Sequence, residues 1–300
     1  MLVLGDSVAF GIGCLLGDRG TTDHDCPPQP GFTTWNGTLG ACNLTRGFVV
    51  LQNRTAQVDY NCHDWDSRFK TLVDEHDPKL VVINTSGWEI VDRWTYDAFP
   101  SGCVVTNVYP CSPPPDVRWG DPAVAAATEA AYASELRAVI ELVRYRHPTT
   151  TKVLVVNGPY IAPPGPSYVY GKQVWYEAYP QSQPADWMLP NAGVTYRSSK
   201  PKIDQLNAAI AAVKATYYAN DPNVVTFDMW RHFAPPDPTT GDNEYSVSVC
   251  PAPDDEQPLS TCAGSEVVAR EADGNHITSA GYQLLGYYLL PVVRQLLGLQ

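Results

Sequence analysis

The stretch MLVLGDSVAFGIG, residues 1–13, places a serine directly after a short aliphatic run. Leu2–Leu4 predict a buried strand because the run is continuous and apolar, and Gly5 ends it. The residues after Ser7 predict a helix, so Ser7 lies where the strand turns into the helix, close to the helix's first N–H groups. This position suits a nucleophile, and it equally suits an ordinary helix N-cap.

The same aliphatic pattern recurs along the chain and alternates with helical patterns. Continuous apolar runs are expected for parallel strands that helices cover on both faces. The further expected strands are 48–51, 80–83, 153–156 and 224–227, and the expected helices are 66–76, 121–147, 200–220 and a last one, 280–300, broken near Pro291. This alternation predicts an α/β fold, a three-layer α/β/α sandwich with a parallel, flavodoxin-like sheet.

The chain is expected to be a single domain over residues 1–300, with loop insertions at about 92–120 and 161–200. Loops of this length inside a compact domain are usually functional or disordered. The second insertion is rich in aromatic residues, including Trp175 and Trp187. These rings are expected to form either a substrate wall or a small aromatic cluster that stiffens the loop.

Eight cysteines in loop-like surroundings predict disulfide-stabilised loops and an oxidising, extracytoplasmic compartment, either secreted, periplasmic or on the cell surface. Sequence alone does not fix the pairing. Proximity favours the pairs Cys14–Cys26, Cys42–Cys62, Cys103–Cys111 and Cys250–Cys262. The chain starts at its first strand with no export signal, which predicts that the native protein has further sequence upstream of Met1.

Charge and histidine placement exclude several function classes. The formal net charge of −12 argues against nucleic-acid binding, which needs a basic surface. Cysteines and histidines lack the close spacing of a zinc site, so no metal is expected. His232 and the other scattered histidines are interpreted as surface or structural residues, and the acidic run 254–256 as a solvated loop.

One further pair of residues bears on the role of Ser7. Asp273 and His276 lie three residues apart in a glycine-containing turn before the last expected helix. A serine hydroxyl becomes a good nucleophile when an imidazole accepts its proton, and that imidazole needs an acceptor on its other nitrogen. Asp273 and His276 satisfy this requirement if the carboxylate folds back onto the ring. The alternative is that Asp273 caps the helix and His276 only packs there.

Gly-Asp-Ser after the first strand and Asp-x-x-His before the last helix resemble the SGNH (GDSL-type) hydrolase superfamily. The resemblance implies that Ser7 is the nucleophile, His276 the general base and Asp273 the residue that orients His276. It also implies a three-layer α/β/α fold, in agreement with the pattern of strands and helices, and a mechanism without metal or other cofactor.

The family's two middle motifs supply an oxyanion hole together with the N–H of the nucleophile, here Ser7. The first is a loop glycine, for which this chain offers Gly40. The second is Gly-x-Asn-Asp after the third strand, whose asparagine donates a hydrogen bond. This chain instead has GWE at 87–89, so the expected donors are Trp88, through its indole N–H, or Asn84.

The departure GWEIVDR, residues 87–93, is similar to the C-terminal SGNH domains of bacterial family-three membrane acyltransferases. This resemblance implies an acyl-ester hydrolase or O-acyltransferase that acts on carbohydrate O-acyl groups, with acetyl the expected group. It also implies a membrane acyltransferase domain N-terminal to this one in the native chain. The alternatives are a free-standing secreted esterase or lipase of broad short-chain specificity, and a catalytically impaired glycan-binding module on the same fold.

Overall fold

The structure is a computed structural model, and it describes residues 1–18, 28–40, 42, 44–45, 48–52, 55–58, 64–85, 89, 93–95, 122–159, 199–243, 246–271 and 276–299. The two expected insertions lie almost wholly outside these residues, so the aromatic wall expected in the second one stays a prediction. Within the described ranges, no helix combines the length and the apolarity needed to cross a membrane.

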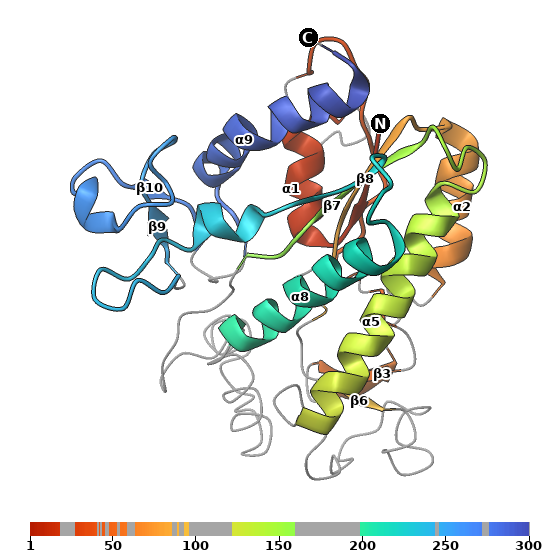
Figure 1. Cartoon of the computed structure of the whole chain (residues 1–300), viewed down its shortest axis with the longest axis horizontal. Helices are drawn as coiled ribbons and strands as arrows, with labels where there is room; N and C mark the ends of the chain where they lie inside the picture. The colour runs from red at the N-terminus through yellow and green to blue at the C-terminus, as the bar shows by residue number, and fades with distance from the viewer. Residues whose placement is uncertain are drawn as a thin grey trace.

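Five parallel strands form the central sheet, in the order β2–β1–β5–β7–β8 (Figure 1). These strands are β1 (Leu2–Gly5), β2 (Trp35–Asn36), β5 (Leu80–Asn84), β7 (Lys152–Val156) and β8 (Val224–Phe227). Every residue of β1 and β5 is buried, as expected for a parallel sheet that is covered on both faces. Four of the five strands expected from the aliphatic runs are therefore in the central parallel sheet.

Alternate residues of each strand face two separate hydrophobic cores. Val3 and Val82 pack with α1 (Ser7–Leu15) and α9 (Ser279–Leu297), whereas Leu4 and Ile83 belong to the core on the other face. The helices of that second core are α2 (Trp65–His76), α5 (Pro122–Val143) and α8 (Ser199–Tyr217). Figure 1 shows both helical layers, and the expected three-layer α/β/α sandwich is confirmed.

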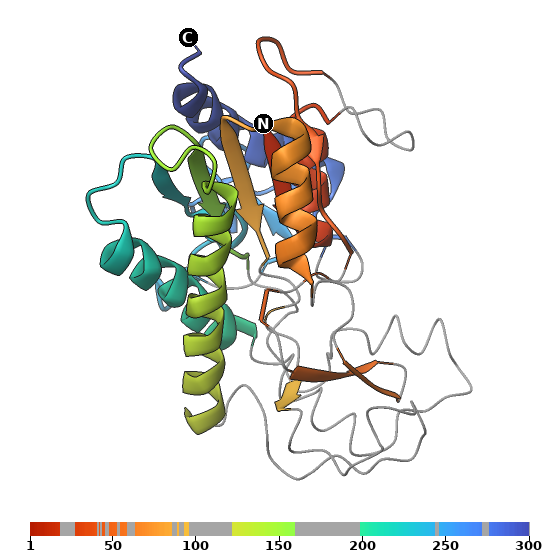
Figure 2. The same ribbon diagram turned by 90° about the vertical axis from the view of Figure 1, so that its right-hand side faces the viewer.

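The expectation of a parallel strand at Phe48–Leu51 is wrong. The strand β3 (Phe48–Gln52) exists, but it pairs antiparallel with β4 (Thr55–Val58) and β6 (Arg93–Thr95) in a separate sheet (Figure 2). Only two residues separate β3 from β4, and a connection this short permits antiparallel pairing alone. The short strand β2 occupies the edge of the central sheet beside β1.

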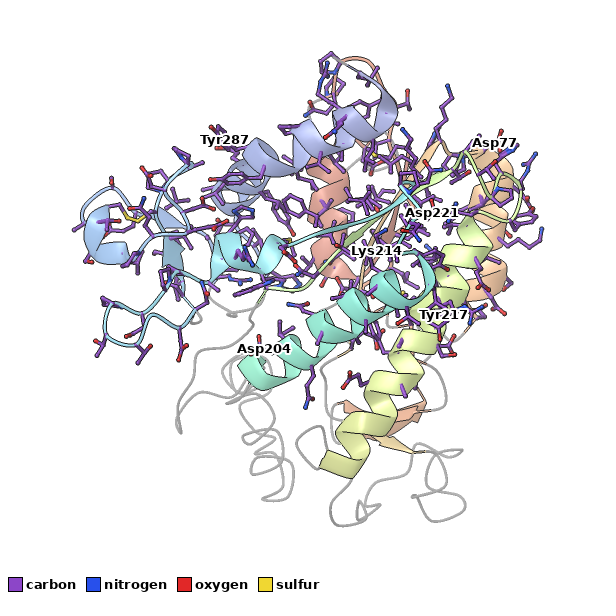
Figure 3. All side chains as sticks on the ribbon, viewed as in Figure 1. Asp77, Asp204, Lys214, Tyr217, Asp221 and Tyr287 are labelled. Carbon is purple, nitrogen blue, oxygen red and sulfur yellow. A yellow bond between two sulfur atoms is a disulfide. The ribbon has the colours of Figure 1, made fainter. Side chains whose placement is uncertain are left out.

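Helix α9 runs through Pro291 instead of breaking there, so that expectation is also wrong. Proline lacks the N–H that would donate to the carbonyl of Tyr287 one turn earlier. Tyr287 is 58% exposed and points outward from the helix (Figure 3), and Pro291 lies on the same exposed side. Water can therefore hydrate the carbonyl that loses its partner, and the opposite side of the helix stays packed on the sheet.

A disulfide joins Cys250 to Cys262, which confirms that predicted pair (Figure 3). The loop that it closes contains Asp255, which is fully buried and not solvated as expected. The Asp255 carboxylate lies 2.8 Å from Nδ1 of His232 and also accepts a hydrogen bond from the hydroxyl of Tyr288 on α9. The loop is thus attached to the body of the protein through one buried carboxylate.

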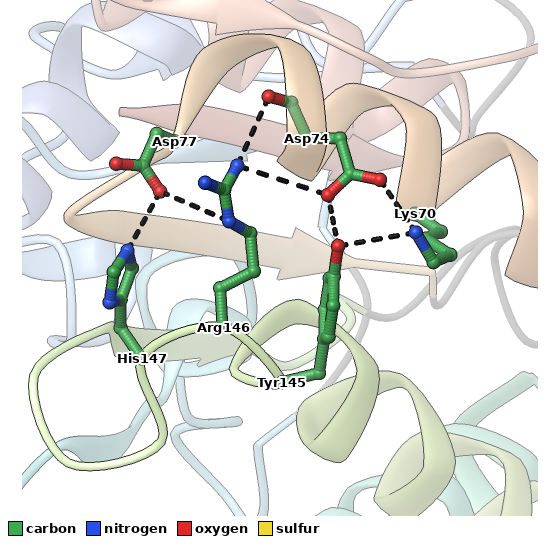
Figure 4. A network of polar contacts seen from close by, with 6 residues as sticks. All are labelled: Lys70, Asp74, Asp77, Tyr145, Arg146 and His147. Carbon is green, nitrogen blue, oxygen red and sulfur yellow. Dashed lines mark hydrogen bonds and ion pairs between the residues drawn. The ribbon is translucent and has the colours of Figure 1, made fainter.

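A polar network lies at the edge of the sheet where β5 and β7 begin. It joins the two turns that lead into these strands (Figure 4). Asp74 binds Lys70 at 2.6 Å and accepts a hydrogen bond from Tyr145, and these two donors lower the pKa of its carboxyl. His147 lies 3.0 Å from Asp77. These side chains are largely exposed, so the network aligns the two turns but adds little stability.

Candidate functional site

Ser7 is the first residue of α1, directly after β1. Gly5 makes the turn, with φ of +140°, and a Cβ at this position would lie 1.6 Å from the carbonyl oxygen of Asn84. The buried Asp6 is the N-cap, and its carboxylate accepts hydrogen bonds from the N–H groups of Val8 and Ala9. The N-cap alternative for Ser7 is therefore wrong, because Asp6 fills that role and leaves the Ser7 hydroxyl available.

His276 reaches Ser7 from the opposite end of the chain. Its Nε2 lies 2.9 Å from Oγ of Ser7, a hydrogen bond in which the hydroxyl donates when Nε2 carries no proton. The backbone on either side of 272–275 is paired, since Glu271 N–H donates to the His276 carbonyl and Thr278 N–H to that of Ala269. This hairpin holds the imidazole just before α9.

Asp273, the third expected member of the triad, lies outside the described residues. Its sequence position is within the four-residue connection between the paired residues Glu271 and His276. Its role toward the imidazole therefore stays a prediction.

Gly40 lies beside the turn that carries Ser7. The segment after Trp35 runs parallel to β1, and the N–H groups of Gly37 and Leu39 donate to the carbonyls of Val3 and Gly5 at 2.8 and 2.9 Å. Leu39 is thus bonded to the residue at which β1 ends, and Gly40 follows it directly in the chain. Gly40 is exposed at the same edge of the sheet.

Of the two remaining oxyanion candidates, Asn84 is among the described residues and Trp88 is not. Both N–H groups of the Asn84 amide are engaged, because Nδ2 donates to the carbonyls of Val156 and Asn157 at 3.0 and 3.2 Å. Asn84 therefore ties β5 to β7 and is not the expected oxyanion donor. Trp88 lies outside the described residues.

The N–H of Ser7 is at the N-terminal end of α1. It is the first amide of α1, where helix N–H groups have no partner within the helix and the helix dipole favours negative charge. Among the described residues, no hydrogen bond to this N–H is found. A carbonyl oxygen that lies against Ser7 can therefore accept it without displacing a protein group.

Glu89 is a residue whose role the sequence does not reveal. Its fully buried carboxylate accepts hydrogen bonds from the N–H of Leu44, from the N–H of Thr45 at 3.3 Å, and from the Thr45 hydroxyl at 2.6 Å. The indole of Trp65 donates to the Leu44 carbonyl at 3.0 Å. Glu89 thus holds Leu44 and Thr45, which follow Gly40 in the chain, and its position in the GWE motif is the sequence signal for it.

Tyr282 on α9 closes the site against α1. Its hydroxyl donates to the Val8 carbonyl at 3.0 Å, and its ring fills the space beside Gly11, where a Cβ would lie 1.9 Å from the ring. Burial raises the pKa of this phenol, with the negative charge of Asp6 a smaller cause. The hydroxyl is therefore protonated and able to donate.

The other cysteines bear on the loops near the site. Cys14 and Cys42 are both disulfide-bonded. The expected pairs Cys14–Cys26, Cys42–Cys62 and Cys103–Cys111 each involve residues outside the described ranges, so these pairings stay predictions.

Comparisons with known proteins are sparse. No family model matches the chain, and no curated protein matches it. Among solved structures it is similar to a crystal structure from Bacteroides fragilis NCTC 9343 that is described as a "putative acylhydrolase". The two chains are 14% identical, the TM-score is 0.47, and the alignment covers 98% of this chain and 86% of the other.

Proposed function

We propose that this protein is a serine-dependent enzyme that cleaves or transfers acyl groups in carboxylic esters. The observation that carries the proposal is the 2.9 Å contact between Oγ of Ser7 and Nε2 of His276, at the carboxyl edge of a parallel sheet. A hydroxyl and an imidazole at this distance form the nucleophile and general base of acyl transfer. The position of Ser7 at the start of α1 adds amide N–H groups where negative charge would develop.

The reaction proceeds in two balanced halves. Oγ of Ser7 attacks the ester carbonyl carbon while His276 accepts the hydroxyl proton. The bond between that carbon and the alcohol oxygen then breaks, and the leaving alkoxide takes the proton from His276. In the second half, water or a sugar hydroxyl attacks the acyl-enzyme and gives its proton to His276. That proton returns to Ser7 as the acyl group leaves.

Asp273 would orient the imidazole and stabilise its positive charge. The backbone N–H groups of Ser7 and Gly40 would bind the oxyanion, with Trp88 as a third donor. Losing one donor of this kind costs about 3 kcal/mol of transition-state stabilisation. The positions of Ser7 and Gly40 at one edge of the sheet support this assignment.

The proposed substrate is a carbohydrate O-acyl ester, with acetyl as the acyl group that the sequence resemblance favours. The resemblance also supports a location outside the cytoplasm and a membrane acyltransferase domain upstream in the native chain. The Cys250–Cys262 disulfide is in keeping with an oxidising compartment. Water as the second acceptor gives hydrolysis, and a sugar hydroxyl gives transfer.

A fluorophosphonate probe tests the proposal directly, because it labels only a serine that a neighbouring base activates. We expect the folded protein to be labelled on one serine, the Ser7→Ala variant to be unlabelled, and the Ser260→Ala variant, at an exposed serine outside the site, to be labelled as the wild type. Absence of labelling in the folded wild-type protein would contradict the proposal and leave a glycan-binding module on a hydrolase fold.

A second measurement separates hydrolysis from transfer. The protein is incubated with an acetylated sugar and with p-nitrophenyl acetate, each with and without a free oligosaccharide acceptor, and acylated products are identified by mass spectrometry. New acylated oligosaccharide identifies a transferase, and free acid alone identifies a hydrolase. Turnover of the simple ester without any turnover of the acetylated sugar would favour a broad short-chain esterase.

A further inference from the structure

A groove begins at the Ser7 hydroxyl and runs between α1 and the start of α9. The cavity has a volume of about 640 Å³, and both Ser7 and His276 line it. It is larger than one acetyl group requires, because it extends beyond the reacting atoms. The groove therefore has space for a part of the substrate that does not react.

One side of the groove is a single face of α1. Ser7, Phe10, Gly11, Cys14 and Leu15 line it, and their spacings of three, four, seven and eight residues place all of them on one helical face. With a rise of 1.5 Å per residue, this face extends about 12 Å from the nucleophile. The groove is thus continuous with the reacting centre and directed away from it.

The floor of the groove is apolar. Phe10 and Leu15 are half-buried, Ile277 is buried, and the Tyr282 ring is held against Gly11 by its hydrogen bond to Val8. These side chains present carbon atoms and no oriented polar group. A ligand segment that fits here gains by removing apolar surface from water.

The polar residues of the groove are at its rim or already engaged. Glu271, Ser279 and Gln283 are exposed. The amide nitrogen of Gln29 donates to the carbonyl of Leu15 at 3.0 Å. A sugar needs inward-facing donors and acceptors for its hydroxyls, and this floor has none among the residues that the structure describes.

We infer that the groove binds the acyl chain of the substrate, and that the preferred acyl group is of medium length, longer than the acetyl group that the sequence resemblance favours. The inference rests on the proposed function, because it requires Ser7 to attack an ester. If the alcohol half is a carbohydrate, the apolar groove fits the other half of the ester. Each methylene that the groove buries strengthens binding roughly fourfold.

The test is a chain-length series of p-nitrophenyl esters from acetate through butyrate and hexanoate to octanoate. We expect kcat/KM to rise with chain length and to exceed the acetate value by about tenfold or more at octanoate. Octyl acetate, measured beside ethyl acetate, places the same alkyl chain on the alcohol half. It is expected to show no comparable gain.

A matched pair of variants locates the effect. Gln283→Trp adds an indole at the rim of the groove, whereas Gln295→Trp makes the same change at an exposed position of α9 outside it. Gln283→Trp should lower the ratio of octanoate to acetate kcat/KM by about fivefold or more, and Gln295→Trp should leave the ratio as in the wild type.

Three outcomes would contradict the inference while leaving the proposed function intact. They are a wild-type preference for acetate, a preference that follows the alcohol chain, and an unchanged ratio in Gln283→Trp. Failure of the proposed function gives a different result, in which no ester is turned over and the fluorophosphonate probe does not label Ser7.

Discussion

At the scale of single residues, the site combines two side chains whose sequence motifs are short but whose positions are strongly constrained. Gly5 is required by backbone contact with Asn84, and Asp6 is required as the N-cap of α1. These requirements hold whether or not Ser7 reacts. The contact with His276 is the one feature of the turn that folding alone does not demand.

The first prediction concerns the general base. His276→Ala should lower kcat/KM for an ester substrate by about a hundredfold to ten-thousandfold, because the Ser7 hydroxyl loses its proton acceptor. Asp273→Ala should retain weak activity, since an imidazole without an orienting carboxylate is still a base. Initial rates with a p-nitrophenyl ester measure both effects.

His147→Ala is the matched control, because His147 is an exposed histidine whose ring lies 3.0 Å from Asp77, at the edge of the sheet far from Ser7. Its activity should equal that of the wild type. Wild-type rates in His276→Ala would remove His276 from the mechanism.

The second prediction concerns Glu89, whose buried carboxylate binds Leu44 and Thr45. Glu89→Gln keeps the size of the side chain but weakens its hydrogen bonds to Leu44 and Thr45. If Gly40 is the proposed oxyanion donor, it is then held less firmly. We expect kcat to fall by about tenfold with little change in KM, because the loss is felt mainly in the transition state.

Glu141→Gln, at an exposed glutamate on α5, is the control for the same chemical change and should not alter kcat. Steady-state kinetics on both variants, with circular dichroism to verify folding, decide the matter. If Glu89→Gln raised KM and left kcat intact, Glu89 would not act through the oxyanion segment.

At the scale of elements, Asp255 fastens the disulfide-closed loop to its surroundings. It binds His232 from the short 3-10 helix η2 (Met229–Phe233) and Tyr288 from α9. Asp255 and His232 are buried, and Tyr288 is half-buried. The rings of His232 and Tyr288 also stack at 4.0 Å. One carboxylate therefore joins three elements that are distant in sequence.

The third prediction follows from this arrangement. Asp255→Ala should lower the free energy of unfolding by about 2 to 4 kcal/mol, because it leaves the buried His232 and the half-buried Tyr288 without this hydrogen-bond acceptor. Asp254→Ala, at the exposed neighbouring residue, should change it by less than about 0.5 kcal/mol. Urea denaturation followed by fluorescence gives both values, and equal effects would show that Asp255 is not the anchor.

The sequence predicts elements well where one physical cause dominates. The runs at Leu2–Leu4, Leu80–Ile83 and Val153–Val156 are buried on both faces, and their continuous apolar residues predict this directly. The run at Val224–Phe227 forms the edge strand β8, where only Val224 is fully buried. The run at Phe48–Leu51 has the same composition, but its pairing depends on the short connection to β4. Strand β2 has only two residues and leaves no periodic signal.

The sequence also cannot reveal residues whose role depends on distant contacts. Asp255 lies in an acidic run that is typical of exposed loops, and only the packing of His232 and Tyr288 shows why it is buried. The sequence likewise does not reveal the role of Glu89, because its partners are more than forty residues earlier in the chain. In contrast, Ser7 and His276 are marked by motifs at the two ends of the chain.

At the scale of the whole molecule, the site is closed only when the first and last elements pack together. Helices α1 and α9 share one hydrophobic core, and the contact between Ser7 and His276 lies beside it. The sheet holds α1 in place through β1, which lies between β2 and β5. Disturbing either terminal element should therefore open the site.

The fourth prediction uses this coupling. In a urea titration, fluorophosphonate labelling of Ser7 and the tryptophan fluorescence change should have the same midpoint, because the base leaves the nucleophile only when the sandwich unfolds. Labelling that disappears at clearly lower urea than the fluorescence change would show that the hairpin carrying His276 detaches first, as a separate local opening.

The contact between Ser7 and His276 spans 269 positions of the chain. During synthesis on the ribosome, the Ser7 hydroxyl therefore emerges 269 residues before the His276 imidazole. A nascent or prematurely terminated polypeptide consequently carries an inert serine, however well its early strands have formed. Under the proposed function, acyl transfer would begin only after His276 has been added to the chain and the hairpin that carries it has packed beside α1.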